Sequence, residues 1–329
     1  MDIRTIFRKK LLSLGELARD KDLEGIWVPD DLTPAEVDGC IHSLFREKAK
    51  EYVRAYQGTQ YFEYLLGKAF EKAGFQRFDE PLRILDICSG AGNSVVPLLA
   101  MFPQAEVIAS DLSVELLAML KQLLLSQGTA DRCTLVQMNA ERLDFEDGAV
   151  DLVVGAAALH HLFRPDLTIA SCARILRPGG LAVFFEPFET GFMYMKLLYQ
   201  EILADPRAGE IDAAVRLFLE EMLIDINRRT GEDKSDPIFK QVDDKWFFTA
   251  DYFREHSRRY GFRDCTIYPL STGTREFEDK LGVILRLGLD RKPEALPDWA
   301  WEYARSRDRE LLASGRCDWI YDGGALLQK

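Results

Sequence analysis

The segment ILDICSGAGNS, residues 84–94, has the pattern of a buried strand that runs into a glycine-rich turn and then into a helix. Gly90 and Gly92 remove side chains that would keep a ligand away, and the helix start offers unpaired N–H groups. A dinucleotide-binding turn also needs a third glycine at position 95, where this chain has Val95. The segment therefore predicts a ligand-binding turn and argues against a dehydrogenase.

On both sides of this turn, short apolar runs alternate with longer polar stretches of helical pattern. Such an alternation predicts parallel strands joined by crossover helices. We therefore expect an α/β fold with a Rossmann-like, doubly wound, mostly parallel sheet of seven strands. The candidate strands are LRILDIC (82–88), EVIASD (106–111), CTLVQM (133–138), VDLVVGAA (150–157), LAVFFE (181–186), CTIYPL (265–270) and GALLQK (324–329).

Helical patterns precede and interrupt the predicted sheet. Thr33-Pro34-Ala35-Glu36 is typical of a helix start, and the run that follows ends near Gly58. A second helix stops at Gly74. We expect residues 1–80 to form a helical N-terminal lid and residues 81–329 to form the Rossmann-like domain, with helical inserts at about 190–245 and 275–318.

Composition and charge limit the class of protein. The net charge of −12 disfavours a nucleic-acid partner, because such partners bind mainly through Lys and Arg. No run approaches the roughly 20 apolar residues of a membrane span, and the N-terminus lacks a secretory pattern. We expect a cytoplasmic protein with no membrane partner and no metal, and the sequence allows a homodimer without requiring one. The irregularly spaced cysteines, which suggest neither disulfides nor zinc, are Cys40, Cys88, Cys133, Cys172, Cys265 and Cys317.

Two polar positions that follow later strands indicate a nucleoside. Asp111 ends the second run of the sheet, 21 residues after Gly90, where its carboxylate can accept hydrogen bonds from both ribose hydroxyls. Asn139 and Ala140 follow the third run, where the Asn139 side chain and the Ala140 N–H can contact adenine.

In this order the motifs resemble the class I S-adenosylmethionine-dependent methyltransferases, in particular the branch that acts on sugars and natural products. The resemblance runs from Tyr52 to about Leu270. The family usually has glycine and aspartate where this chain has Cys88 and Asn139. The motifs that carry it are LDICSGAG (85–92), Asp111, MNAERLDF (138–145), VDLVVGAAALHHLFRPD (150–166) and ARILRPGGLAVFFEPF (173–188).

The resemblance implies S-adenosyl-L-methionine as the cofactor. In the family, the acid that opens the glycine motif lies near the methionine amino group, and here that acid is Asp86. We expect the cofactor to contact Tyr56, Asp86, Cys88, Gly90, Gly92, Asp111, Leu112, Asn139, Ala140 and Ala156.

Three residues at strand ends are the candidates for catalysis. His160 and His161 follow the fourth strand, and Glu186 ends the fifth, so all three face the ligand crevice of an open α/β sheet. Related natural-product methyltransferases carry a similar His-His pair and acid, which are implicated in handling the acceptor. The residues alone leave two alternatives open: one histidine can be structural, and Glu186 can bind a main-chain amide or a cation instead of the acceptor.

Aromatic side chains near the motifs are candidates for the acceptor pocket. Tyr56 and Tyr61 precede the glycine turn and are lid candidates, although core packing is the more common role of helical aromatics. We expect Tyr61, Phe188 and Tyr194 to contact the substrate.

The predicted function is transfer of the S-adenosylmethionine methyl group to a small-molecule acceptor, with a His/Glu pair that deprotonates or positions it. A second hypothesis is cyclisation or aminocarboxypropyl transfer, which releases methylthioadenosine. A third is a cofactor-binding partner subunit without turnover. The product released from S-adenosylmethionine separates the three.

Overall fold

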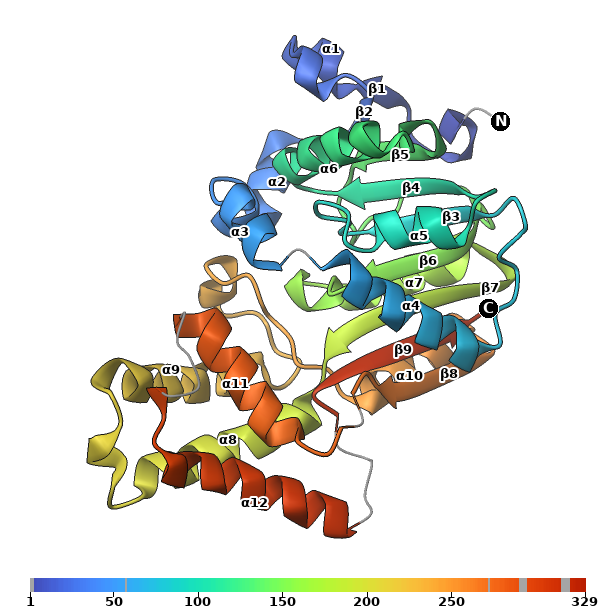
Figure 1. Cartoon of the computed structure of the whole chain (residues 1–329). Coiled ribbons are helices and arrows are strands. Elements are labelled where there is room, and N and C mark those ends of the chain that lie inside the picture. The colour runs from blue at the N-terminus through green and yellow to red at the C-terminus, as the bar shows by residue number, and fades with distance from the viewer. Residues whose placement is uncertain (1–2, 57, 272, 290–294, 315–319) are drawn as a thin grey trace.

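The computed structural model describes residues 3–56, 58–271, 273–289, 295–314 and 320–329. Within this part of the chain, nine strands form one sheet in the order β1-β2-β5-β4-β3-β6-β7-β9-β8 (Figure 1). The strands are β1 (Leu11–Ser13), β2 (Ile26–Pro29), β3 (Arg83–Ile87), β4 (Glu106–Asp111), β5 (Cys133–Gln137), β6 (Val150–Ala156), β7 (Leu176–Pro187), β8 (Asp264–Pro269) and β9 (Asp322–Gln328).

The sheet is parallel from β2 to β7, and antiparallel pairs occur only at its two ends within the described residues. The predicted doubly wound, mostly parallel α/β fold is therefore confirmed. The strand count of seven is wrong. The two additional strands, β1 and β2, come from the N-terminal region that we expected to be helical only.

Helices cover both faces of the sheet, as Figure 1 shows. One face packs against α4, α5 and α6, and the other packs against α7 and α10. Strand residues alternate between the two cores; Ile84 packs on one side of β3 and Leu85 on the other. The helices are α1 (Leu14–Ala18), α2 (Pro34–Cys40), α3 (Ala49–Tyr56), α4 (Thr59–Ala73), α5 (Val95–Met101), α6 (Val114–Gln127), α7 (Pro165–Ile175), α8 (Glu189–Ala204), α9 (Ala213–Arg229), α10 (Ala250–Tyr260), α11 (Glu276–Leu289) and α12 (Asp298–Ser314).

The N-terminal helices follow the predicted signals at their ends but not in between. Thr33 caps α2 by accepting a hydrogen bond from the Glu36 N–H, and α4 ends at Gly74, which has the left-handed φ of 62°. The expected continuous run to Gly58 is broken between α2 and α3. His42 stabilises the break, since its ring accepts from the Leu44 N–H and contacts the Gln241 carbonyl.

The two predicted helical inserts come together in space. Helices α8, α9, α11 and α12 share a core of their own, which lies below the sheet in the view of Figure 1. None of the helices in the described residues combines the length and apolarity needed to cross a bilayer.

Candidate functional site

A cavity of ≈ 340 Å³ lies at the carboxyl ends of β3, β4, β5 and β6. The strand order reverses at β3, with β4 on one side and β6 on the other, and such a switch point opens a crevice in parallel sheets. The N-terminal segment covers it, because residues between α2 and α4 line the opposite wall. The predicted site residues that line this cavity are Tyr61, Cys88, Gly90, Asp111, Leu112, Asn139, Ala140, Ala156 and His161.

The glycine turn leaves bare backbone in the cavity. Gly90 has a φ of 53°, and a Cβ built there would meet no atom within 4 Å, so open space lies over it. Cys88 adopts a left-handed φ of 51°, which a glycine would adopt without strain. Gly92 does not line the cavity; its φ is 100°, and a Cβ there would lie 2.5 Å from the Leu120 side chain. Gly92 thus serves the packing of the turn on α6.

Asp111 is fixed by backbone groups and keeps capacity for a ligand. One carboxylate oxygen accepts from the Gly90 N–H and the other from the Ser113 N–H, both at 2.8 Å. A carboxylate has about four lone-pair sites, so each oxygen can accept one further bond. Burial raises the pKa of Asp111 to about 6.

Asp86 lies behind the turn and does not line the cavity. Its side chain is fully buried and has no ion pair among the described residues, and the hydroxyls of Ser89 and Ser94 lie close enough to favour its ionised form. Burial raises the pKa of Asp86 to about 7. A buried carboxylate without an ion pair is costly unless a cation reaches it, and a ligand's ammonium would have to reach Asp86 past the turn because its side chain does not line the cavity.

Asn139 links the cavity wall that follows β5 to the N-terminal segment. Its amide oxygen accepts from the Glu141 N–H at 2.9 Å, and its NH₂ donates to the Glu36 carboxylate at 3.1 Å. The family's aspartate at this position would lack that donor and would face a like charge. The contact therefore explains why this chain has asparagine.

We expect Asn139→Asp to lower the free energy of unfolding by about 1–2 kcal/mol, because a charge-assisted hydrogen bond becomes a repulsion between carboxylates. Urea denaturation measures this loss. In a Glu36→Gln background the same substitution should cost much less. An equal cost in both backgrounds would show that the contact with Glu36 is not the reason.

Glu186 is buried and accepts four hydrogen bonds. Its Oε1 accepts from the N–H groups of Ala158 at 3.0 Å and Leu159 at 2.7 Å, and its Oε2 accepts from the N–H of His160 at 3.2 Å. The Nδ1 of His160 lies 2.5 Å from the same Oε2. The carboxylate therefore holds the turn that carries both histidines, Leu159–His161, and neither it nor His160 lines the cavity.

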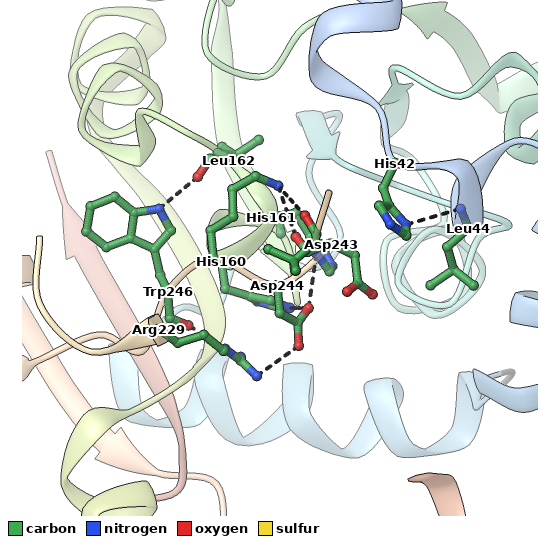
Figure 2. Close-up of polar contacts among 12 residues, drawn as sticks. His42, Leu44, His160, His161, Leu162, Arg229, Asp243, Asp244 and Trp246 are labelled. Carbon is green, nitrogen blue, oxygen red and sulfur yellow. Dashed lines mark hydrogen bonds and ion pairs between the residues drawn. The ribbon is translucent and has the colours of Figure 1, made fainter. Parts of the chain in front are cut away.

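A chain of charges continues from His160 into the helical insert (Figure 2). The Nε2 of His160 lies 3.4 Å from Asp244, and Asp244 forms an ion pair with Arg229 at 3.0 Å. Burial lowers the pKa of His160, but the carboxylates of Glu186 and Asp244 outweigh it and raise the value to about 9. His160 is thus an imidazolium at neutral pH.

His161 is the histidine that lines the cavity. Its Nδ1 lies 3.2 Å from the Asp243 carbonyl and 3.3 Å from the Asp244 carboxylate, so Nδ1 carries the proton and Nε2 the lone pair. Burial and the charge of His160 lower the pKa of His161 to about 3. The ring is therefore neutral at physiological pH and accepts hydrogen bonds.

The ligand atoms of His160, His161 and Asp244 lie within 4.8 Å of one another, which is the one group of possible metal ligands in the described residues. Arg229 already supplies a positive charge at Asp244. The absence of a metal stays a prediction.

Comparisons with known proteins agree with this geometry. The methyltransferase domain family matches residues 84–180. A malonyl-[acyl-carrier protein] O-methyltransferase from Methylococcus capsulatus is 38% identical over 104 residues, which are 32% of this chain and 37% of that protein. A ubiquinone/menaquinone biosynthesis C-methyltransferase from Stutzerimonas stutzeri is 34% identical over 105 residues, 32% of this chain and 41% of that protein. The chain carries a class I S-adenosylmethionine-dependent methyltransferase domain.

The fold likeness extends beyond the matched segment. The crystal structure of a candidate sarcosine dimethylglycine methyltransferase from Galdieria sulphuraria has a TM-score of 0.51 at 15% identity and covers 86% of this chain and 98% of that one. That likeness shows the fold alone. The chain matches about two fifths of the length of the two curated relatives.

Several residues predicted for the site lie elsewhere in the structure. Phe188 is fully buried in the core against Phe253, and Tyr194 packs its ring against Phe277 of α11; neither lines the cavity. Tyr61 lines it and is exposed, as expected of a residue at the mouth. Tyr56 ends α3, but its side chain lies outside the described residues.

Sequence reasoning missed the part of the cavity that comes from the first insert. Asp243 and Lys245 line the cavity, and Asp244 contacts both histidines. These residues lie more than 80 positions after His161 and belong to no motif of the family, so no local signal marked them. His42 and Phe45 were missed in the same way because their segment was expected to be helical.

Proposed function

We propose that this protein transfers the methyl group of S-adenosylmethionine to a small-molecule acceptor. The observation that carries the proposal is that one cavity joins the glycine turn and Asp111 to His161 and the covering N-terminal segment. The covered cavity favours a small acceptor, and the net charge of −12 is unfavourable for a nucleic acid. The relatives are named as methyltransferases, which supports the same reaction class.

The residues present fit this cofactor. Asp111 has free acceptor sites for two ribose hydroxyls, and Gly90 leaves open space over the turn. The carboxylate of Asp86, which has no ion pair among the described residues, is the group that would hold the ammonium of the methionine moiety. When bound, the cofactor supplies a sulfonium methyl whose carbon–sulfur electron pair stays on sulfur as the acceptor's lone pair forms the new bond.

His161 and the Glu186 carboxylate have separate tasks in this proposal. The neutral ring of His161 accepts a hydrogen bond from the acceptor and orients it. With a pKa of about 3, the ring is a weak base, so orientation is its main contribution. Glu186 acts through the turn that it holds and is a positioning residue.

Cofactor binding should depend on pH through two carboxyl groups. The pKa of Asp111 is about 6 and that of Asp86 about 7, and both must be ionised to bind their partners. The affinity for the cofactor is therefore highest above these two pKa values and falls as the pH decreases through them. Between pH 8 and pH 5, adenosine, which contacts only the Asp111 side, should weaken roughly tenfold, and S-adenosylhomocysteine considerably more.

Calorimetry over this pH range measures both ligands. Asp111→Asn cannot titrate, so its adenosine profile should be flat above pH 5. A wild-type profile that is equally flat would contradict the assignment of Asp111 to the ribose.

The experiment that tests the function has two stages. S-adenosylmethionine and S-adenosylhomocysteine are first titrated into the purified protein by calorimetry. The protein is then incubated with S-adenosylmethionine and a deproteinised metabolite extract, and the products are analysed by mass spectrometry. Methyl transfer predicts S-adenosylhomocysteine together with an acceptor heavier by one methylene. Methylthioadenosine would indicate attack on the aminocarboxypropyl side, and binding without any product would indicate a non-catalytic subunit.

A further inference from the structure

Lys245 is a buried cation in the wall of the cavity. The relative exposure of Lys245 is 3%. The ammonium donates to the carbonyls of Val242 at 3.2 Å and Asp243 at 3.1 Å. An ammonium has three N–H donors, so these two bonds leave one donor free for a further partner.

No carboxylate among the described residues lies within 4.0 Å of the Lys245 ammonium. Three acids share the cavity. Asp111 accepts from backbone N–H groups, Glu141 accepts from the N–H groups of Phe163 and Arg164, and Asp243 lies two residues before Lys245 in the chain. Burial lowers the pKa of Lys245 from its ordinary value, and the charges of Asp243, Asp244 and Glu141 oppose this shift without forming an ion pair with the ammonium. A buried charge without a counter-ion is costly, and an anionic ligand would remove that cost.

Much of the cavity wall that Lys245 shares is apolar or aromatic. The ammonium lies 4.7 Å from the centre of the Phe163 ring, and Phe45, Tyr52 and Leu162 line the same cavity. Among the described residues that line it, Lys245 is the only lysine or arginine. A ligand here therefore meets one positive charge in a largely apolar wall that also carries acids.

Lys245 also lies beside the histidine that we assign to the acceptor. Its ammonium and the Nδ1 of His161 both contact the carbonyl oxygen of Asp243, at 3.1 and 3.2 Å. The Lys245 N–H donates to the His160 carbonyl at 2.7 Å, which ties the insert to the histidine turn. Whatever the ammonium binds is thus held next to His161.

We propose that Lys245 binds an anionic oxygen, a carboxylate or an ionised phenol, on an otherwise apolar acceptor. The inference rests on the proposed function, since it gives the substrate class of the same cavity. An ionised oxygen has no proton to donate, so the hydrogen bond that His161 accepts would come from a second group of the acceptor.

The test compares anions with neutral analogues of similar shape. Benzoate and benzamide form the carboxylate pair, and 4-nitrophenolate and 4-nitroanisole form the phenolate pair; each is titrated by calorimetry at pH 8 with and without S-adenosylhomocysteine. For at least one pair we expect the anion to bind roughly tenfold or more tightly, as a hydrogen bond between charged groups implies. Lys245→Met should abolish this preference, and Lys245→Arg should keep most of it.

Lys240→Met is the matched control, because Lys240 lies five residues earlier, is exposed and does not line the cavity. It should keep the wild-type preference. The proposal is overturned if neither anion is preferred, if no anion binds at concentrations up to about 10 mM, or if Lys245→Met retains the preference. Binding of S-adenosylhomocysteine is measured separately. If the wild-type protein does not bind it, the proposed function is refuted and the anion site is not.

Discussion

Asp111→Ala is expected to weaken the binding of S-adenosylhomocysteine by roughly 100-fold. Two hydrogen bonds from the ribose hydroxyls to a carboxylate are lost, and each contributes about 1.5 kcal/mol or more. The substitution also frees the Gly90 and Ser113 N–H groups that the carboxylate holds at 2.8 Å, which loosens the turn under the ligand. Isothermal titration of the purified variant measures the change.

Two further variants separate the ribose contact from general effects. Asp111→Asn keeps one acceptor oxygen and the side-chain volume, so its affinity should lie between those of wild type and Asp111→Ala. Glu106→Ala changes an exposed acid at the opposite end of the same strand and should leave binding unchanged. If Glu106→Ala and Asp111→Ala weaken binding equally, the effect comes from the net charge and the assignment of Asp111 fails.

The sheet was predictable where its strands are long and buried. Runs such as residues 84–87 and 150–156 are mostly apolar and buried on both sides, which is typical of central parallel strands. β1 and β2 are three and four residues long, and β2 pairs with β5 at only two positions. Strands this short carry no periodicity, so tertiary contacts decide them.

The site was predictable where spacing along the chain is fixed by the fold. Gly90 and Asp111 follow adjacent parallel strands, so their distance in sequence predicts their meeting in space, and the structure joins them by a hydrogen bond. Lys245 reaches the cavity from a separate insert, and its place depends on long-range packing that no spacing rule describes. Phe188 was predicted to contact the substrate but is buried in the core. The sequence could not distinguish the two, because an aromatic residue can face a pocket or the core in the same sequence pattern.

Glu186 illustrates a position that the sequence located without deciding its role. Its place at a strand end is compatible with an acceptor ligand or with a main-chain anchor. The structure gives its two oxygens four hydrogen bonds and no access to the cavity. That geometry favours the anchor.

Glu186→Gln is therefore expected to lower the free energy of unfolding by about 2–3 kcal/mol. The amide oxygen can still accept from Ala158 and Leu159, but the NH₂ group would face the N–H of His160, so two donors oppose each other in a buried site. Glu186→Ala leaves all these donors without a partner and should cost about 3–5 kcal/mol. Urea denaturation followed by circular dichroism measures both.

The control is Glu189→Gln, a half-buried acid three residues later with no ion pair within 4.0 Å among the described residues. It changes the same functional group and should alter the unfolding free energy by less than about 0.5 kcal/mol.

Stability is the measurement that separates the two roles of Glu186. A carboxylate that binds the acceptor can be replaced by an amide with little change in unfolding and a large rise in the KM for the acceptor. A carboxylate that anchors the turn cannot be replaced by an amide without a loss of stability. If Glu186→Gln is as stable as the wild type, Glu186 does not anchor the turn and contacts the acceptor instead. A loss of about 2–3 kcal/mol in the free energy of unfolding would establish that Glu186 acts by holding His160 and His161 in place.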